Sequence, residues 1–164
     1  MTIALSTDHA GFEQLKQLQK FLEELGHDCR YLGPKSFSAH DDFPRFIMPA
    51  ARAVAEGQCD RGIIMGGSGQ GEAMVANRLP GVRCAVYYGP AVPRRAIDAE
   101  GHQSHDPFSI VRLSRAHNDA NMLSLAARFL SLEEMKGAVR VWLETEFDDK
   151  TDHARRIREM DEEL

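Results

Sequence analysis

The sequence has no long apolar run. None of its uninterrupted apolar stretches approaches the roughly 18–20 residues that a membrane-spanning helix needs, so we expect no membrane anchor. The opening residues, MTIALSTDHAG, also lack the basic start and the long apolar core of a secretory signal. We therefore expect neither a signal peptide nor a membrane partner.

Cysteine is scarce and shows no pairing pattern. Cys29, Cys59 and Cys84 are an odd number of cysteines with no close spacing. Small secreted domains that depend on disulfides use even numbers of cysteines at regular spacing. We interpret the three side chains as reduced thiols and expect a cytoplasmic protein.

The sequence also has no excess of basic charge. Its 20 Lys and Arg residues are outnumbered by 25 Asp and Glu residues, which gives a formal net charge of −5. Nucleic-acid-binding domains normally carry a basic excess or a basic stripe, so no nucleic-acid partner is expected. A small anionic ligand is still compatible with this composition, because a pocket can be locally basic.

Strand-like and helix-like segments alternate along the chain. The expected strands are 2–7, 27–32, 62–65, 83–88 and 122–126. The expected helices are 11–25, 44–56, 71–78, 131–144 and 151–163. Alternation of this kind builds βαβ units. The sequence therefore predicts an α/β protein with one domain over residues 1–164, a Rossmann-like three-layer sandwich around a parallel five-stranded sheet.

The segment IIMGGSGQGE, residues 63–72, ends an expected strand in a glycine-rich turn. Ligands of open parallel sheets bind at the carboxyl ends of the strands, and glycines let backbone N–H groups approach an anion there. The segment lacks the Gly-Lys-Ser/Thr ending of a P-loop and the spacing of the dinucleotide motif, so NAD is not expected. By itself the segment fits an oxyanion cradle and a plain strand-to-helix turn equally well.

Two further segments place polar side chains at the ends of elements. Asp8 and His9 follow the first expected strand. His117 to Asp119 end a helix that comes just before the last expected strand. Asp8 could instead simply cap the first helix, and a lone histidine at a helix end is more often structural. Each of these signals is ambiguous when it is taken alone.

Together, the motifs resemble one family. DHAGF, GGSGQGE with ANR, GVRCAV, SRAHNDAN and HARRI occur in the order and approximate spacing of ribose-5-phosphate isomerase B and the related galactose-6-phosphate isomerase subunits. The resemblance covers almost the whole chain. It implies an aldose–ketose isomerase that works through an enediolate, needs no metal or organic cofactor, and forms a homodimer or a dimer of dimers with shared sites.

The substrate that the resemblance implies is a small sugar phosphate. Ribose 5-phosphate and ribulose 5-phosphate are the default pair. Another tetrose, pentose or hexose phosphate is the alternative, and a third reading is a non-catalytic, sugar-phosphate-binding partner subunit.

The resemblance assigns the catalytic base to Glu72. One branch of the family uses a cysteine at the position of Gly66, and the other has G-G-S-G-x-G-E and uses the glutamate. By the same resemblance, the catalytic residues are Glu72, Ser68, Asp8 and His117, and the substrate- or phosphate-binding residues are His9, Gly67, Gly69, Gly71, Asn118, Arg128 and Arg156. A helix N-terminus lowers the pKa of a carboxyl group and weakens it as a base, so partial burial has to offset this effect at Glu72.

The chain departs from the family at Asp152, where an arginine usually precedes the histidine of the last motif. Asp152 stands four residues before Arg156, so the two side chains could pair on a helix surface. A carboxylate repels a phosphate dianion. We expect a phosphate site that is weaker, rebuilt, or suited to a different substrate.

A second departure is the segment 89–108, which is longer than the usual link and is expected to be an inserted loop. Its Arg94 and Arg95 could replace the missing arginine, because guanidinium groups bind phosphate in a bidentate way. The same loop carries a loose cluster, His102, His105 and Asp106, that resembles metal ligands. The prolines and glycines around them indicate a flexible loop, so no metal site is expected.

Overall fold

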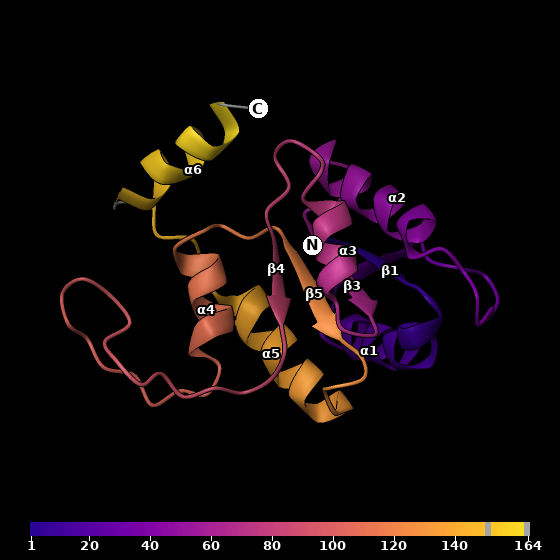
Figure 1. Cartoon of the computed structure of the whole chain (residues 1–164), viewed down its shortest axis with the longest axis horizontal. Helices are drawn as coiled ribbons and strands as arrows, with labels where there is room; N and C mark the ends of the chain where they lie inside the picture. Colours follow the sequence, from indigo (N-terminus) through magenta and orange to yellow (C-terminus); the bar gives the residue numbers. More distant parts are fainter. Residues whose placement is uncertain (150–151, 163–164) are drawn as a thin grey trace.

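Five parallel strands form the centre of the molecule. The structure is a computed structural model and describes residues 1–149 and 152–162. The strands are β1 (Thr2–Thr7), β2 (Asp28–Tyr31), β3 (Arg61–Gly66), β4 (Cys84–Tyr87) and β5 (Met122–Ala126). They pair in parallel in the order β2-β1-β3-β5-β4 (Figure 1). The predicted parallel five-stranded sheet is confirmed.

Helices cover both faces of the sheet. They are η1, a short 3₁₀ helix (His9–Gly11), α1 (Phe12–Glu24), α2 (Phe43–Ala55), α3 (Gln70–Ala76), α4 (Ser109–Ala116), α5 (Leu132–Glu144) and α6 (Asp152–Glu162). Buried side chains of α1, α4 and α5 pack with the sheet in one apolar cluster, and those of α2 and α3 pack with it in another. Two helical layers around one sheet are the predicted three-layer sandwich.

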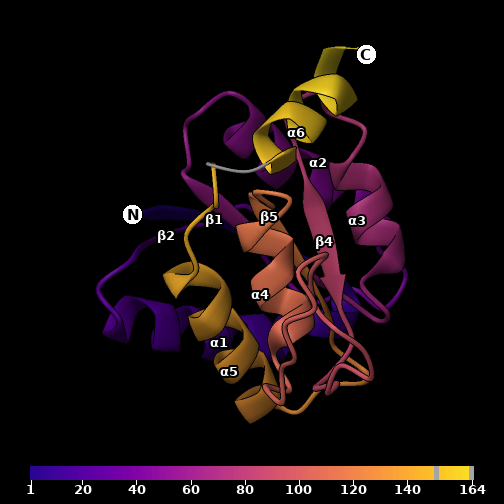
Figure 2. The same cartoon turned by 90° about the vertical axis from the view of Figure 1, so that its left-hand side faces the viewer.

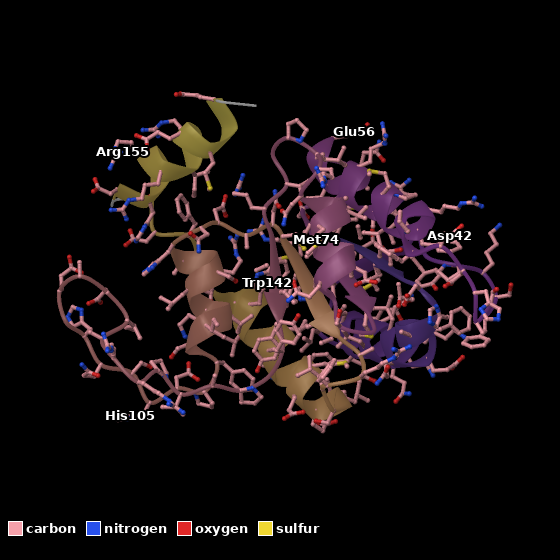
Figure 3. The ribbon with its side chains drawn as sticks, in the orientation of Figure 1. Asp42, Glu56, Met74, His105, Trp142 and Arg155 are labelled. Carbon is pink, nitrogen blue, oxygen red and sulfur yellow. The ribbon has the colours of Figure 1, made fainter. Side chains whose placement is uncertain are left out.

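The three inner strands are buried on both faces, which explains their nearly continuous apolar sequences. All five residues of β5 are buried, as are the last five of β1 and of β3. The edge strands β2 and β4 are only partly buried. The largest buried side chain, Trp142 of α5, lies in the middle of the molecule (Figure 3).

The topology defines two edges of the sheet. Because the strands are parallel, β1, β3, β4 and β5 all end on one side of the sheet (Figure 1). This row of strand ends is called here the carboxyl edge, and the opposite row, where the strands begin, is called the amino edge. Helix α6 lies beyond the amino edge, away from the sheet, in both views (Figures 1 and 2). No helix in the described ranges is long and apolar enough to cross a membrane.

Sequence reasoning missed the start of α4. Only the end of that helix was expected, before His117, whereas the structure begins it at Ser109, directly after the long loop. The other elements lie within about two residues of their expected bounds, which is the usual uncertainty of element ends. Residues 151 and 163, the expected ends of the last helix, lie outside the described residues.

Candidate functional site

The glycine-rich turn after β3 is tied to the end of β5. The Gly66 and Gly67 carbonyls accept hydrogen bonds from the backbone N–H groups of Ala127 (2.9 Å) and Arg128 (3.1 Å). The Ser124 hydroxyl donates to the Gly69 carbonyl at 2.7 Å. These bonds involve the carbonyls of the turn and hold it in a fixed shape at the carboxyl edge.

The turn depends on glycine at two positions. Gly69 has a φ of 73°, in the left-handed region that glycine adopts without strain, and α3 begins directly after it. Gly66 is needed for a different reason, because Glu72 folds back over it. A Cβ atom on Gly66 would lie 2.0 Å from the carboxyl carbon of Glu72. The carboxylate therefore fills the space that a side chain at position 66, such as the cysteine of the other branch, would need.

Glu72 is a buried carboxyl group with a perturbed pKa. The residue is only 5% exposed. Burial raises its pKa above the usual value, and the nearby Asp8 carboxylate raises it further, whereas a backbone N–H and His9 lower it. Burial thus outweighs the helix N-terminus, as a general base at this position requires. A base whose pKa lies closer to neutral pH is better matched to proton abstraction.

Asp8 and His9 stand beside Glu72, at the end of β1. Asp8 is 5% exposed, and its Oδ1 accepts the N–H of Ala10 at 2.9 Å, so it does cap a helix, the short η1. The capping and the site interpretations of Asp8 are compatible. The His9 ring Nδ1 lies 3.5 Å from Asp8 Oδ2 and 2.7 Å from Asp41 Oδ1. Asp41 was not expected at the site, because it belongs to a polar loop far from Asp8 in sequence.

Ser68 and Arg128 complete this edge. Ser68 is exposed at the top of the glycine-rich turn, and its hydroxyl accepts a long hydrogen bond from the Gln70 N–H at 3.4 Å. A Cβ on Gly67 would lie 3.3 Å from the Arg128 guanidinium carbon. A hydroxyl, a guanidinium and a buried carboxylate thus all lie at the glycine-rich turn of the carboxyl edge.

His117, Asn118 and Arg156 form a second group, at the amino edge. His117 follows α4, and its ring stacks on that of His153 from α6, with centroids 4.1 Å apart and an angle of 18°. Burial lowers the pKa of His117, and so does the nearby His153. At neutral pH the His117 ring is therefore mostly uncharged, which suits a group that accepts and returns a proton.

The turn after His117 is rigidly held. Asp119 has a φ of 44°, which is uncommon for a residue with a side chain. Its two carboxylate oxygens accept hydrogen bonds from Arg115 (2.6 Å) and Arg83 (2.8 Å). Arg115 is 3% exposed and also donates to the Ala120 carbonyl at 2.8 Å. These partly buried ion pairs fix the backbone that carries His117.

The two groups do not meet within one chain. Gly62 pairs with Met122 at the amino edge and Gly66 with Ala126 at the carboxyl edge. The edges are therefore separated by four residues of strand, about 13 Å at roughly 3.3 Å per residue. His117 lies before Met122, and Glu72 lies beyond Gly66, so the predicted catalytic residues are split between the two edges.

The last helix shows the consequence of Asp152. Its Oδ2 lies 3.5 Å from the Arg156 guanidinium and 3.6 Å from that of Arg155, so the predicted pairing with Arg156 is present. Arg155 also donates to Glu159 at 2.6 Å. Arg155 lies on the outer side of α6 (Figure 3). The carboxylate thus stands where it neutralises part of the positive charge of Arg156.

The long loop runs outward beside α4, away from α3 (Figures 1 and 2). Its base is closed by a hydrogen bond from the Ala91 N–H to the Pro107 carbonyl (2.8 Å). Arg94 and Arg95 line a hollow against Ile110 of α4 and do not approach the glycine-rich turn of the same chain. The side chain of His105 is on this loop, at the opposite end of the molecule from Asp42 (Figure 3).

Among residues 1–149 and 152–162, two groups of side chains have ligand atoms close enough together to hold a metal ion, and neither is the loose cluster noted in the sequence. Asp106 is engaged with Arg112 (2.9 Å) and does not gather with the two loop histidines. The donor atoms that do lie within 4.8 Å of one another belong to Asp98, Glu100 and His102, at the exposed loop tip, and to Asp8, His9 and Asp41. In both groups the histidine Nδ1 is already hydrogen-bonded to an aspartate.

Comparison with known proteins gives one consistent result. The profile of the Ribose/Galactose Isomerase family matches residues 3–102 and 99–160. Ribose-5-phosphate isomerase B of Mycolicibacterium paratuberculosis is 32% identical over 157 residues, 96% of this chain and 87% of that protein. D-erythrulose-4-phosphate isomerase 2 of Mycolicibacterium smegmatis is 27% identical over 162 residues, 98% of this chain and 95% of that protein.

Solved structures agree with this result. Ribose-5-phosphate isomerase B of Clostridium thermocellum superimposes with a TM-score of 0.84 and 32% identity, over 99% of this chain and 96% of that one. The Mycoplasma genitalium ribose-5-phosphate isomerase B with bound ribulose 5-phosphate also has a TM-score of 0.84, with 28% identity over 99% of this chain and 95% of that one.

Proposed function

The chain belongs to the ribose/galactose isomerase family, and on that premise we propose that it interconverts an aldose phosphate and a ketose phosphate, with ribose 5-phosphate and ribulose 5-phosphate as the default pair. The observation that carries this proposal is the buried Glu72 carboxylate, folded over Gly66 beside the backbone N–H groups of the glycine-rich turn. Carbon-acid chemistry needs both a base and donors for the oxygen that becomes negative.

In the proposed reaction, the Glu72 carboxylate takes the proton from C2 of the open-chain aldose. The C2–H electron pair forms the C1–C2 double bond of an enediolate, and the C1 carbonyl oxygen becomes an oxyanion. Backbone N–H groups of Gly67, Gly69 and Gly71, together with the Ser68 hydroxyl, are placed to donate to the enediolate oxygens. The proton of the C2 hydroxyl passes to the O1 oxyanion, the C2–O⁻ electrons then form the C2 carbonyl, and the C1–C2 double-bond pair takes the proton back from Glu72 at C1, which gives the ketose.

The other proposed roles divide between the two edges of the sheet. Asp8 and His117 move the proton that opens the sugar ring, and Asn118 orients the substrate. His9, Arg128 and Arg156 hold the phosphate. Because the two edges are separated within one chain, the proposal includes a homodimer, or a dimer of dimers, in which one copy supplies the carboxyl edge and its partner the amino edge of each site.

A tetrose phosphate is the second candidate substrate. The relative from Mycolicibacterium smegmatis is named for D-erythrulose 4-phosphate, and its match extends over nearly the full length of both chains. Asp152, which pairs with Arg156, changes the charge at the expected phosphate site and is a further reason to test other sugars. A cytoplasmic location is part of the proposal, since the three cysteines are free thiols, as a reducing compartment keeps them.

The test is a panel of tetrose, pentose and hexose phosphates assayed with the purified protein alone. The expected result is turnover of one pair, and a Glu72→Gln variant should lose at least about 10²-fold in kcat. Cys84→Ser, a change of a thiol within β4, is the control and should leave kcat unchanged. Turnover of no sugar phosphate would favour a non-catalytic subunit, and near-normal turnover by Glu72→Gln would overturn the assignment of the base.

A further inference from the structure

We infer that Asp41 is a positioning residue that holds the His9 ring in the orientation needed to bind the substrate phosphate, with the Nδ1 proton directed at Asp41 and Nε2 directed at the ligand. The inference rests on the proposed function, because that proposal gives His9 its ligand. It adds a residue from the loop before α2 to a site otherwise built from strand ends and glycines.

Asp41 contacts His9 twice. Its Oδ1 atom lies 2.7 Å from His9 Nδ1 and accepts the His9 backbone N–H at 3.2 Å. One contact fixes the plane of the ring, and the other fixes the backbone at the start of η1. The Asp8 carboxylate stands on the same side of the ring, 3.5 Å from Nδ1, and does not make the closer contact.

The burial of Asp41 is not explained by the loop around it. Residues 35–40 and Asp42 are exposed, whereas the Asp41 side chain is 5% exposed. Its Oδ2 atom is buried and has no hydrogen-bond partner in the part of the chain that the structure describes. A buried carboxylate is costly unless it has a charged or hydrogen-bonded partner. Here the side-chain hydrogen bonds of Asp41 all go to His9.

These contacts determine which ring atom of His9 meets the ligand. An ionised carboxylate only accepts hydrogen bonds, so Nδ1 must carry the proton. Nε2 is then the ring atom left for the substrate. A phosphate dianion also only accepts, so binding it through Nε2 requires the doubly protonated, positively charged ring. Asp41 Oδ1 and Asp8 Oδ2 lie 2.7 and 3.5 Å from Nδ1, so both carboxylates face the same side of the ring.

The neighbouring Asp42 provides a matched control. It has the same side chain one residue later, but it is 68% exposed and lies near Arg45 at 3.5 Å, on the outer surface at the start of α2 (Figure 3). Asp42→Asn removes the same charge from the same loop without touching His9. A general effect of loop charge would appear equally in both variants.

The kinetic test compares Asp41→Asn and Asp41→Ala with Asp42→Asn, using the substrate found in the panel. We expect Asp41→Ala to raise KM about tenfold or more, the size of a lost hydrogen bond to a charged group, with kcat changed much less. Asp41→Asn keeps an acceptor and should have a smaller effect in the same direction. A KM within twofold of the parent for Asp41→Ala would overturn the inference.

A double-mutant cycle with His9→Asn separates positioning from loop stability. If Asp41 acts through His9, Asp41→Ala should raise KM in the parent and have little further effect in the His9→Asn background. If Asp41 merely stabilises the loop, its substitution should lower the melting temperature and raise KM equally in both backgrounds. Equal effects would therefore overturn the inference.

A measurement without substrate distinguishes this inference from the proposed function. In ¹⁵N-labelled protein, the ring resonances of His9 should report a proton on Nδ1 in the parent and in Asp42→Asn, and a mixture of tautomers in Asp41→Ala. Titration with inorganic phosphate should perturb the Nε2 resonance of the parent more than that of Asp41→Ala. These signals persist even if no sugar phosphate is turned over, and an unchanged Nδ1 signal in Asp41→Ala would contradict the inference.

Discussion

The two edges of the sheet carry the same kind of fixed polar network but different chemical groups. At the carboxyl edge, a buried carboxylate lies over a glycine, beside a turn that β5 holds in place. At the amino edge, two stacked histidines and Arg156 lie near the surface, on a turn held by the buried Arg115. One edge has the proposed base and the proposed oxyanion donors, and the other has imidazoles and a cation.

If the proposed roles of Glu72 and His117 are right, one chain does not hold a complete site. Proton abstraction from C2 and opening of the sugar ring occur on the same small molecule, so both groups have to reach it. About 13 Å of strand separates the edges within the chain. The proposed two-fold symmetric pair, in which each copy contributes a different edge to each site, would bring them together twice.

The largest expected effect is the rescue of two inactive variants by each other. Glu72→Gln removes the base at the carboxyl edge, and His117→Ala removes the imidazole at the amino edge. Each should be nearly inactive alone. After unfolding and refolding together in equal amounts, half of the dimers are mixed and each mixed dimer has one intact site, so about a quarter of the parent activity should return.

The control for this rescue is a mixture of Glu72→Gln with Cys84→Ser, in which half of the sites are intact whatever the pairing. A Glu72→Gln and His117→Ala mixture no more active than its separate components would show that each site is built from a single chain. The comparison between the two edges would then have no functional meaning.

A smaller but still large effect is expected from Gly66→Ala. The new Cβ would lie 2.0 Å from the Glu72 carboxyl carbon, and the end of a flexible side chain can move away. The fold should therefore survive while the base is displaced, and kcat should fall at least about tenfold, since a misplaced catalytic group loses most of its effect.

The matched control is Gly62→Ala, on the same strand, where the new Cβ would meet the end of the Met122 side chain at 2.7 Å and not Glu72. It tests whether overpacking of a β3 glycine by itself lowers activity. Full activity in Gly66→Ala, with the melting temperature unchanged, would show that the observed position of Glu72 is not needed for the reaction.

The sequence was sufficient for one edge and not for the other. The turn from Gly66 to Glu72 is continuous in sequence, so its strand, glycines and helix start could be read directly. The separation of His117 from Glu72 follows from the position of β5 in the sheet. Predicting this separation required the strand order as well as the motifs. Asp41 could not be predicted, because only the folded loop brings it to His9, 32 residues away in sequence.

The long loop offers a third, weaker test. We predicted from the sequence that Arg94 or Arg95 compensates for Asp152, and within one chain both line a hollow against α4 instead of the glycine-rich turn. Their contribution to phosphate binding therefore depends on the second copy. The double variant Arg94→Ala/Arg95→Ala should raise KM about threefold, within the range of exposed charge interactions. A KM and kcat within twofold of the parent would remove the loop from the phosphate site and point to altered substrate choice at Asp152.

The smallest expected effect concerns stability, and it distinguishes the buried carboxylate from the exposed charges of the other edge. Burial raises the pKa of Glu72 above its ordinary value of 4.5. The folded state therefore holds the proton more tightly than the unfolded state. The stability that this group contributes is fully present below pH 4.5, and it is lost as the pH rises through the raised pKa.

Glu72→Gln has no such charge. It should therefore melt higher than the parent at pH 8, by about 2–4 °C for each kcal/mol of free energy of unfolding, and this difference in melting temperature should close towards pH 4. Glu24→Gln, at the exposed end of α1, should show no gap at either pH. A gap for Glu72→Gln that stays constant with pH would mean that the amide simply packs better, and that the carboxylate carries no electrostatic strain at the carboxyl edge.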